Sequence, residues 1–209
     1  LNIAPSDSDF LLVATLTSTD EYSTDQLFFE TPTPGQPNTP GAVGVVGDTM
    51  FSIDRGFFDT PVDMAISTTT PGAEIRYTTD GSPPTATTGL VYSAPVQLTT
   101  TTTIRAAAFK TDHIASNVDT HTYLFLDDVI TQTGAGFPTS WVQLSADYQM
   151  DPNVVNNAAY SSTIKDDLKS LPTLSLVMDE DSWFNPSSNS TVGGIIRNSL
   201  QRGNQSERP

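Results

Sequence analysis

The chain of 209 residues contains no cysteine, which excludes a disulfide framework and thiolate chemistry. Basic residues are few: nine lysines and arginines stand against 24 aspartates and glutamates, giving a formal net charge of −15. Phosphate groups are bound by clusters of basic side chains, so this balance argues against nucleic acid and anionic membranes as partners. No apolar run approaches the about 20 residues of a membrane helix. The sequence therefore predicts neither nucleic-acid binding nor membrane insertion.

Charged residues of both signs make up only 16% of the chain, below the roughly 25% of ordinary globular proteins. Threonine, serine, asparagine and proline supply the polarity instead. Threonine suits a pleated surface, whereas proline and asparagine suit turns. This composition favours a mainly β protein.

Residues 48–126 alternate between apolar and polar side chains over short runs separated by turn signals. Short strands at about 8–12-residue spacing are typical of an antiparallel, immunoglobulin-like β-sandwich. The three alanines at 106–108 could be helical by propensity, but the threonine run before them favours a strand. We expect the strands to bury Met64, Ile66, Ile75, Tyr77, Ile104, Ala106 and Tyr123.

The flanking residues differ in character. Residues 1–31 contain a short apolar run at Phe10–Ala14, which predicts a buried strand, and residues 32–47 are a linker rich in proline and glycine. Residues 127–172 form a connector with one or two short helices. The first begins at Asp151-Pro152 and runs to about Ala159; the second is capped by Ser161 or Ser162 and ends before Pro172. With a strand at residues 173–178, this predicts a small mixed α/β extension after the sandwich.

The strand predicted at 173–178 alternates Leu174, Leu176 and Met178 with less bulky side chains and carries no charge. An exposed apolar strand edge promotes aggregation, so we expect this strand to have a partner. Phe10–Ala14 is the best candidate by length and apolarity. If that strand is paired elsewhere, the partner is another copy of the chain.

One stretch resembles a known family. Tyr77-Thr-Thr-Asp-Gly-Ser-Pro-Pro-Thr85, preceded by Pro71-Gly-Ala-Glu-Ile-Arg76 and followed by Leu90–Val96 and Thr103–Ala108, is similar to the chitobiase/β-hexosaminidase C-terminal domain. The resemblance covers about residues 48–126. It implies an immunoglobulin-like sandwich that serves as an accessory module without catalysis of its own.

Two further resemblances lie at the ends. Leu171–Leu176, Asp181–Pro186 and Arg202–Pro209 resemble the opening of spore-coat-protein-H-like (CotH) atypical kinase domains, so residues 173–209 are expected to be the truncated start of such a domain. Ser206 stands where that family has an aromatic residue, and the residues that would hold nucleotide and metal are not in the chain. Phe29–Asn38 resembles the tail of lamin-tail-like domains, so residues 1–31 are expected to be a strand remnant of one. The arrangement is similar to large secreted bacterial proteins and implies location outside the cell or on its surface.

Few residues suggest a site. Asp80-Gly81 has the pattern of a tight turn, in which Asp bonds nearby backbone and Gly adopts a positive φ. Asp179-Glu180-Asp181 could bind calcium, but the spacing differs from the calcium loop and equally fits the acidic start of a short helix at Ser182–Phe184. Asp127-Asp128 and Asp166-Asp167 are expected to be solvated. His113 and His121 are the only histidines, and a zinc site would need carboxylates from elsewhere.

The sequence therefore predicts no catalytic residue, no metal site and no cofactor. Aromatic side chains could instead stack on sugar rings or pack at an interface; the candidates are Trp141, Trp183 and Tyr148. The expected function is a non-catalytic structural or interaction module that contacts neighbouring domains or other copies of itself. A carbohydrate-binding module and the front part of a CotH-like kinase are the alternatives.

Overall fold

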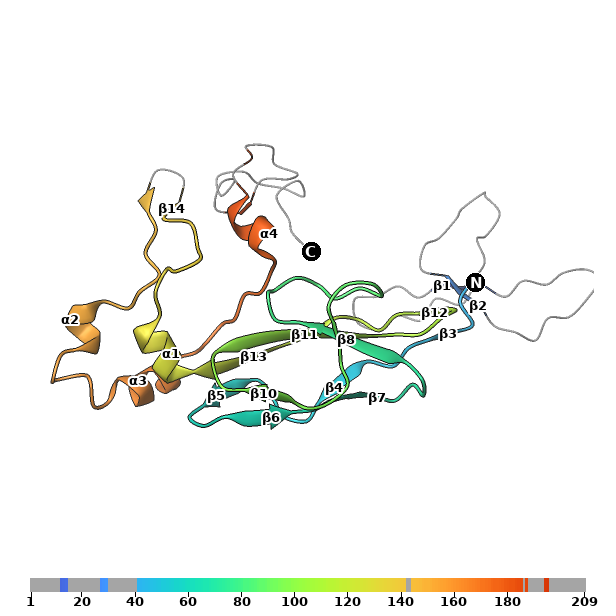
Figure 1. The fold of residues 1–209 in the computed structure, drawn as a ribbon, viewed down its shortest axis with the longest axis horizontal. Coiled ribbons are helices and arrows are strands. Elements are labelled where there is room, and N and C mark those ends of the chain that lie inside the picture. The colour runs from blue at the N-terminus through green and yellow to red at the C-terminus, as the bar shows by residue number, and fades with distance from the viewer. Residues whose placement is uncertain are drawn as a thin grey trace, which may run out of the picture.

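A computed structural model describes residues 12–14, 27–29, 41–141 and 144–185, together with residues 187, 194 and 195. The sequence-based expectations for Phe10 and Leu11, for residues 30–40 of the resemblance and linker at that end, and for Arg202–Pro209 lie outside the described residues. The described part is mainly β, with several small sheets and a few short helices (Figure 1).

The largest sheet has five strands in the order β5-β13-β11-β8-β9. β5 runs parallel to β13, and the other neighbours are antiparallel. Tyr77 pairs with Ala106 and Ile75 with Ala108, so β8 and β11 point these side chains to one face. The bounds of its strands are Gly56–Phe58 (β5), Glu74–Thr78 (β8), Leu90–Val91 (β9), Thr102–Phe109 (β11) and Asp119–Phe125 (β13).

The remaining strands form two-stranded pairs: β4-β7, β6-β10, β3-β12, β1-β2 and β14-β15. Their bounds are Leu12–Ala14 (β1), Leu27–Phe29 (β2), Gly44–Val45 (β3), Thr49–Phe51 (β4), Val62–Met64 (β6), Ile66–Thr68 (β7), Val96–Leu98 (β10), His113–Ile114 (β12), Ser140–Trp141 (β14) and Leu144–Ser145 (β15). Within the described residues, four short helices follow the large sheet: Leu126–Thr131 (α1), Pro152–Val155 (α2), Ile164–Ser170 (α3) and Glu180–Phe184 (α4).

The hydrophobic core draws side chains from the large sheet and from the β4-β7 and β6-β10 pairs, which lie along one side of it in Figure 1. Met64, Ile104, Ala106 and Tyr123 are fully buried, and Ile66 and Ile75 are nearly so, as the alternation predicted. Tyr77 is only half-buried against this core, because its neighbour across the sheet is Leu90 in β9, an exposed strand at the sheet edge.

Tyr123 anchors the centre of this core. Its ring tilts against Phe58 with centroids 5.5 Å apart, and its hydroxyl donates to the carbonyl of Ile53 at 2.8 Å. Burial raises the pKa of Tyr123 to about 12, and the negative charge of Asp54 acts in the same direction. The phenol therefore stays protonated and available as a donor.

The structure differs from three of the expectations about strands. The run Val62–Ile66 is divided at Ala65, where Ser52 bonds both backbone groups, so that Met64 and Ile66 enter different strand pairs. Residues 173–178 were expected to be a strand, but they have no strand pairing. The strand expected at Phe10–Ala14 appears as β1, and its partner is β2 rather than residues 173–178.

The helices largely follow the capping signals. The Asp151 carboxylate accepts a hydrogen bond from the backbone of Asn153, and α2 begins at Pro152 as predicted, although it ends at Val155 rather than near Ala159. α3 begins after Thr163 rather than at Ser161 or Ser162, and buries Ile164. α1 was not predicted. At the other end, Val46 is part of the core and β3 pairs with β12, so the last residues of the expected linker pack with the folded module.

Candidate docking surface and groove

The turn after β8 is built by Asp80. One Asp80 carboxylate oxygen accepts hydrogen bonds from the backbone N–H and the hydroxyl of Ser82, at 3.0 and 2.5 Å. These bonds, the hydroxyl bond first, hold the pKa of Asp80 below its ordinary value. Gly81 takes φ +82°, a conformation that side-chain-bearing residues rarely adopt. The predicted tight turn is confirmed.

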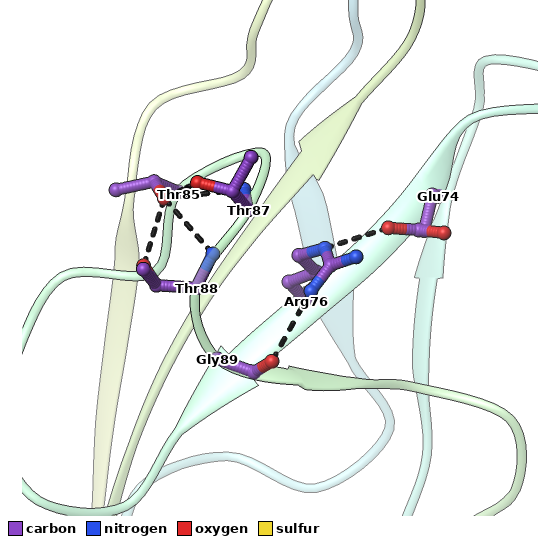
Figure 2. Close-up of polar contacts among 6 residues, drawn as sticks. All are labelled: Glu74, Arg76, Thr85, Thr87, Thr88 and Gly89. Atoms are coloured by element: carbon purple, nitrogen blue, oxygen red, sulfur yellow. Dashed lines mark hydrogen bonds and ion pairs between the residues drawn. The ribbon is translucent and has the colours of Figure 1, made fainter.

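The rest of the loop between β8 and β9 is held by hydroxyl and ion contacts, shown in Figure 2. Thr85 bonds the hydroxyl of Thr88 at 2.7 Å and accepts from its backbone N–H at 3.0 Å. Arg76 bridges Glu74 at 2.6 Å and the carbonyl of Gly89 at 3.3 Å. Arg76 thereby ties the Gly89 end of the loop to β8.

Residues 173–179, here called the docked segment, run in extended form against the outer face of the large sheet, away from the core. The Ser175 and Thr122 hydroxyls are 2.8 Å apart, which joins the segment to β13. At the other end Gly81 leaves no room for a side chain: a Cβ there would clash with the carbonyl oxygen of Met178. The turn and the strand thus make a close-fitting seat for a chain that forms no strand pairing.

Arg105 lies on the same outer face and links the turn to the segment. Its guanidinium donates to the carbonyl of Gly81 at 2.9 Å, while its Nε is buried without a partner among the described residues. Burial opposes ionisation of Asp179, but hydrogen bonds from Ser182 and the positive charge of Arg105 together hold the Asp179 pKa below its ordinary value. Both the start of α4 and the charge of Arg105 on the sheet therefore favour the ionised form of Asp179.

Asp179 also determines where α4 begins. Its carboxylate accepts hydrogen bonds from the Ser182 backbone and hydroxyl, both at 2.8 Å, which is the geometry of an N-cap. The acidic run at residues 179–181 is thus the start of a short helix, the second of the two interpretations open at the sequence level. Among the residues that the structure describes, no group of three His, Asp or Glu could hold a metal ion.

The docked segment and α4 form one wall of a groove of about 730 Å³. Its aromatic side chains are Phe137, Trp183 and Phe184; the ring centroids of Phe137 and Phe184 are 6.0 Å apart. Tyr148 supports Phe137 from behind, with centroids 5.4 Å apart, and its hydroxyl donates to the carbonyl of Pro138 at 3.0 Å. Two of the three aromatic residues singled out in the sequence therefore contribute to one site.

Other candidate residues are placed elsewhere. Trp141 lies in β14, and its side chain is outside the described part. His121 stacks on Phe51 with centroids 4.2 Å apart; burial lowers its pKa, and Arg55 acts in the same direction. His113 lies in β12, with its Nδ1 2.9 Å from the Thr111 carbonyl.

The paired acids outside the sheet have structural contacts that were not expected. Asp127 forms an ion pair with Lys165 at 2.5 Å, and Asp128 accepts from the Thr101 backbone at 2.5 Å. Asp167 accepts from the Thr163 hydroxyl at 2.8 Å. Asp127, Asp166 and Asp167 are exposed to solvent, as expected, and Asp128 is only partly exposed. The contacts of Asp127, Asp128 and Asp167 were not expected, because they depend on how α1 and α3 are placed.

Sequence reasoning missed Phe137, Gln97 and the role of Gly81 at the close approach. An aromatic residue that follows Gly134-Ala-Gly136 in a polar loop has no core to fill from its own neighbours, and this signal could have identified Phe137.

The fold and the outer face define a β-rich module with a segment of its own chain docked on the large sheet. Residues 53–120 match the family model of the chitobiase/beta-hexosaminidase C-terminal domain, which is typically an accessory module. The match excludes residues 29–38 and 171–209, which carry the other two resemblances. No curated protein and no solved structure matched the chain. In the described residues, no helix has the length and apolarity to cross a membrane.

Proposed function

We propose that this chain is a non-catalytic interaction module of a secreted or surface-exposed bacterial protein, and that its outer sheet face holds extended chain segments in place. The seat at Gly81 and Met178 is the observation that carries the proposal. An immunoglobulin-like sandwich, with the β4-β7 and β6-β10 pairs as its second layer, is the architecture that we propose for the module. The shared core of these strand pairs and the large sheet supports it.

A docking role explains how the contacts are distributed. The segment meets the sheet through side chains, through the turn and through the charge of Arg105. Such contacts fix the position of a neighbouring chain segment without pairing it to an edge strand of the sheet. An accessory module that spaces or orients its neighbours needs this kind of attachment.

Replacing Gly81 by alanine tests the seat. An alanine Cβ would push Met178 outward, so chymotrypsin should cut after Leu174 and Leu176 about fivefold faster or more, because cleavage follows the population of the open state. The measurement is the cleavage rate at these two bonds, followed by mass spectrometry in the full chain.

Gly72→Ala is the matched control. Gly72 also has a positive φ, +74°, but a Cβ there meets nothing within 4 Å. Both variants place an alanine in left-handed backbone, which should lower the free energy of unfolding by about 1–2 kcal/mol. Only Gly81→Ala should in addition expose the docked segment. Equal cleavage rates in the two variants would contradict the docking role.

A further inference from the structure

The groove beside the docked segment combines aromatic surface with polar groups that have no positive charge. Phe137 is 50% exposed although its ring contacts those of Tyr148 and Phe184. Trp183 lies next to Phe184 rather than Phe137, with the Trp183 and Phe184 ring centroids 6.5 Å apart. A row of partly open aromatic rings in a concave surface offers stacking area for a flat ligand.

Polar groups line the groove from the turn after β8, from β10 and from α4. The exposed Gln97 of β10 supplies an amide, and Asp80 and Glu180 supply carboxylates. The threonine run 101–103 adds hydroxyl groups along the floor. The amide and the hydroxyl groups can both donate and accept hydrogen bonds, whereas the carboxylates only accept them. A ligand rich in hydroxyl groups therefore satisfies this set best.

The charge of the residues that line the groove disfavours anionic ligands. Among the described residues that line the groove, none is a lysine, arginine or histidine, and the chain as a whole carries a net charge of −15. Anionic polymers are therefore repelled. A sugar ring has an apolar face of C–H groups for the aromatic rings and hydroxyls around its edge for the carboxylates and the amide.

We propose that this groove binds a neutral polysaccharide through one or two of its sugar rings. The inference rests on the proposed function, because the docked segment and α4 form one wall of the groove. It goes beyond that function by giving the module a ligand of its own.

Native gels cast with hydroxyethylcellulose, galactomannan or glycol chitin test the proposal on the full chain. The protein should be retarded by at least one of these neutral polymers and by none of the anionic polymers alginate and heparin. Calorimetric titration with the polymer that retards it then gives a dissociation constant for the variants.

Phe137→Ala should raise that dissociation constant about tenfold or more, since a central aromatic residue dominates such an interface. Gln97→Ala, at an exposed strand position where folding is unaffected, should weaken binding severalfold. Tyr160→Ala is the control, because Tyr160 is also 50% exposed and lies outside the groove. Tyr160→Ala should bind like the unaltered chain.

Absence of retardation by all three neutral polymers would overturn the inference, as would equal weakening by Phe137→Ala and Tyr160→Ala. If the chymotrypsin result still distinguishes Gly81→Ala from Gly72→Ala, the docking role stands and only the ligand assignment is lost. If it does not, the wall of the groove is not in place and both proposals fail.

Discussion

Replacing Tyr123 by alanine should lower the free energy of unfolding by about 3–5 kcal/mol, the range for buried aromatic side chains. Tyr123 is fully buried in the core, where its ring contacts Phe58 of the neighbouring strand β5, and its hydroxyl donates to the Ile53 carbonyl. The substitution leaves a cavity and an unpaired acceptor at the same place. Urea unfolding at neutral pH, followed by circular dichroism, measures the change.

Two other variants serve as comparisons: Tyr123→Phe isolates the hydrogen bond, and Tyr77→Ala removes a less buried ring. Tyr123→Phe keeps the ring and loses only the hydrogen bond to Ile53, so it should cost about 1–2 kcal/mol. Tyr77→Ala removes a half-buried ring in β8, next to the edge strand β9, and should cost about 1–3 kcal/mol. A larger loss for Tyr77→Ala than for Tyr123→Ala would contradict the core assigned here.

Replacing Asp119 by alanine should have the second-largest effect, about 2–3 kcal/mol, as for hydrogen bonds to a charged group. One Asp119 oxygen accepts from both the backbone N–H and the hydroxyl of Thr49, at 3.1 and 2.6 Å, and so joins β13 to β4. Thr49 is 7% exposed, so its backbone N–H would lose its partner without gaining water, and its hydroxyl would keep only the Ala106 carbonyl, 3.5 Å away. The same urea titration measures the loss.

Asp119→Asn is the matched control, because its amide oxygen can still accept one of these bonds. It should cost less than half as much as Asp119→Ala. Equal losses would show that the charge, and not the acceptor at this position, holds β4 in place.

The alternation of apolar residues predicted β8, β11 and β13 because each has one face toward the core and one away from it. Ala106 and Ala108 are buried in β11, so the neighbouring threonines were a better guide than alanine's helix propensity. The division at Ala65 could not be predicted, since it depends on Ser52, which is distant in sequence.

The docked segment shows where alternation is ambiguous. Leu174 and Leu176 alternate as in a strand, and the chain there is extended, but these side chains are 82% and 63% exposed and the segment lies against a sheet face. Alternating apolar residues indicate an extended backbone, whereas strand pairing also requires the free edge of another strand within hydrogen-bonding distance. The chemistry of Trp183 and Tyr148 predicts a role for both. Their link runs through Phe137 and Phe184, and it depends on how the loop after α1 meets α4.

The position of the docked segment is the central claim, and a disulfide tests it most directly. The chain has no cysteine, so the double variant Thr122→Cys/Ser175→Cys carries the only two thiols. The native hydroxyls are 2.8 Å apart, which places two sulfur atoms within bonding reach. After mild oxidation we expect a monomer with one intrachain disulfide, detected by intact mass and on a non-reducing gel. The two single-cysteine variants cannot form this disulfide and serve as controls. Free thiols after oxidation, or chains linked into dimers through these positions, would contradict the position of the docked segment.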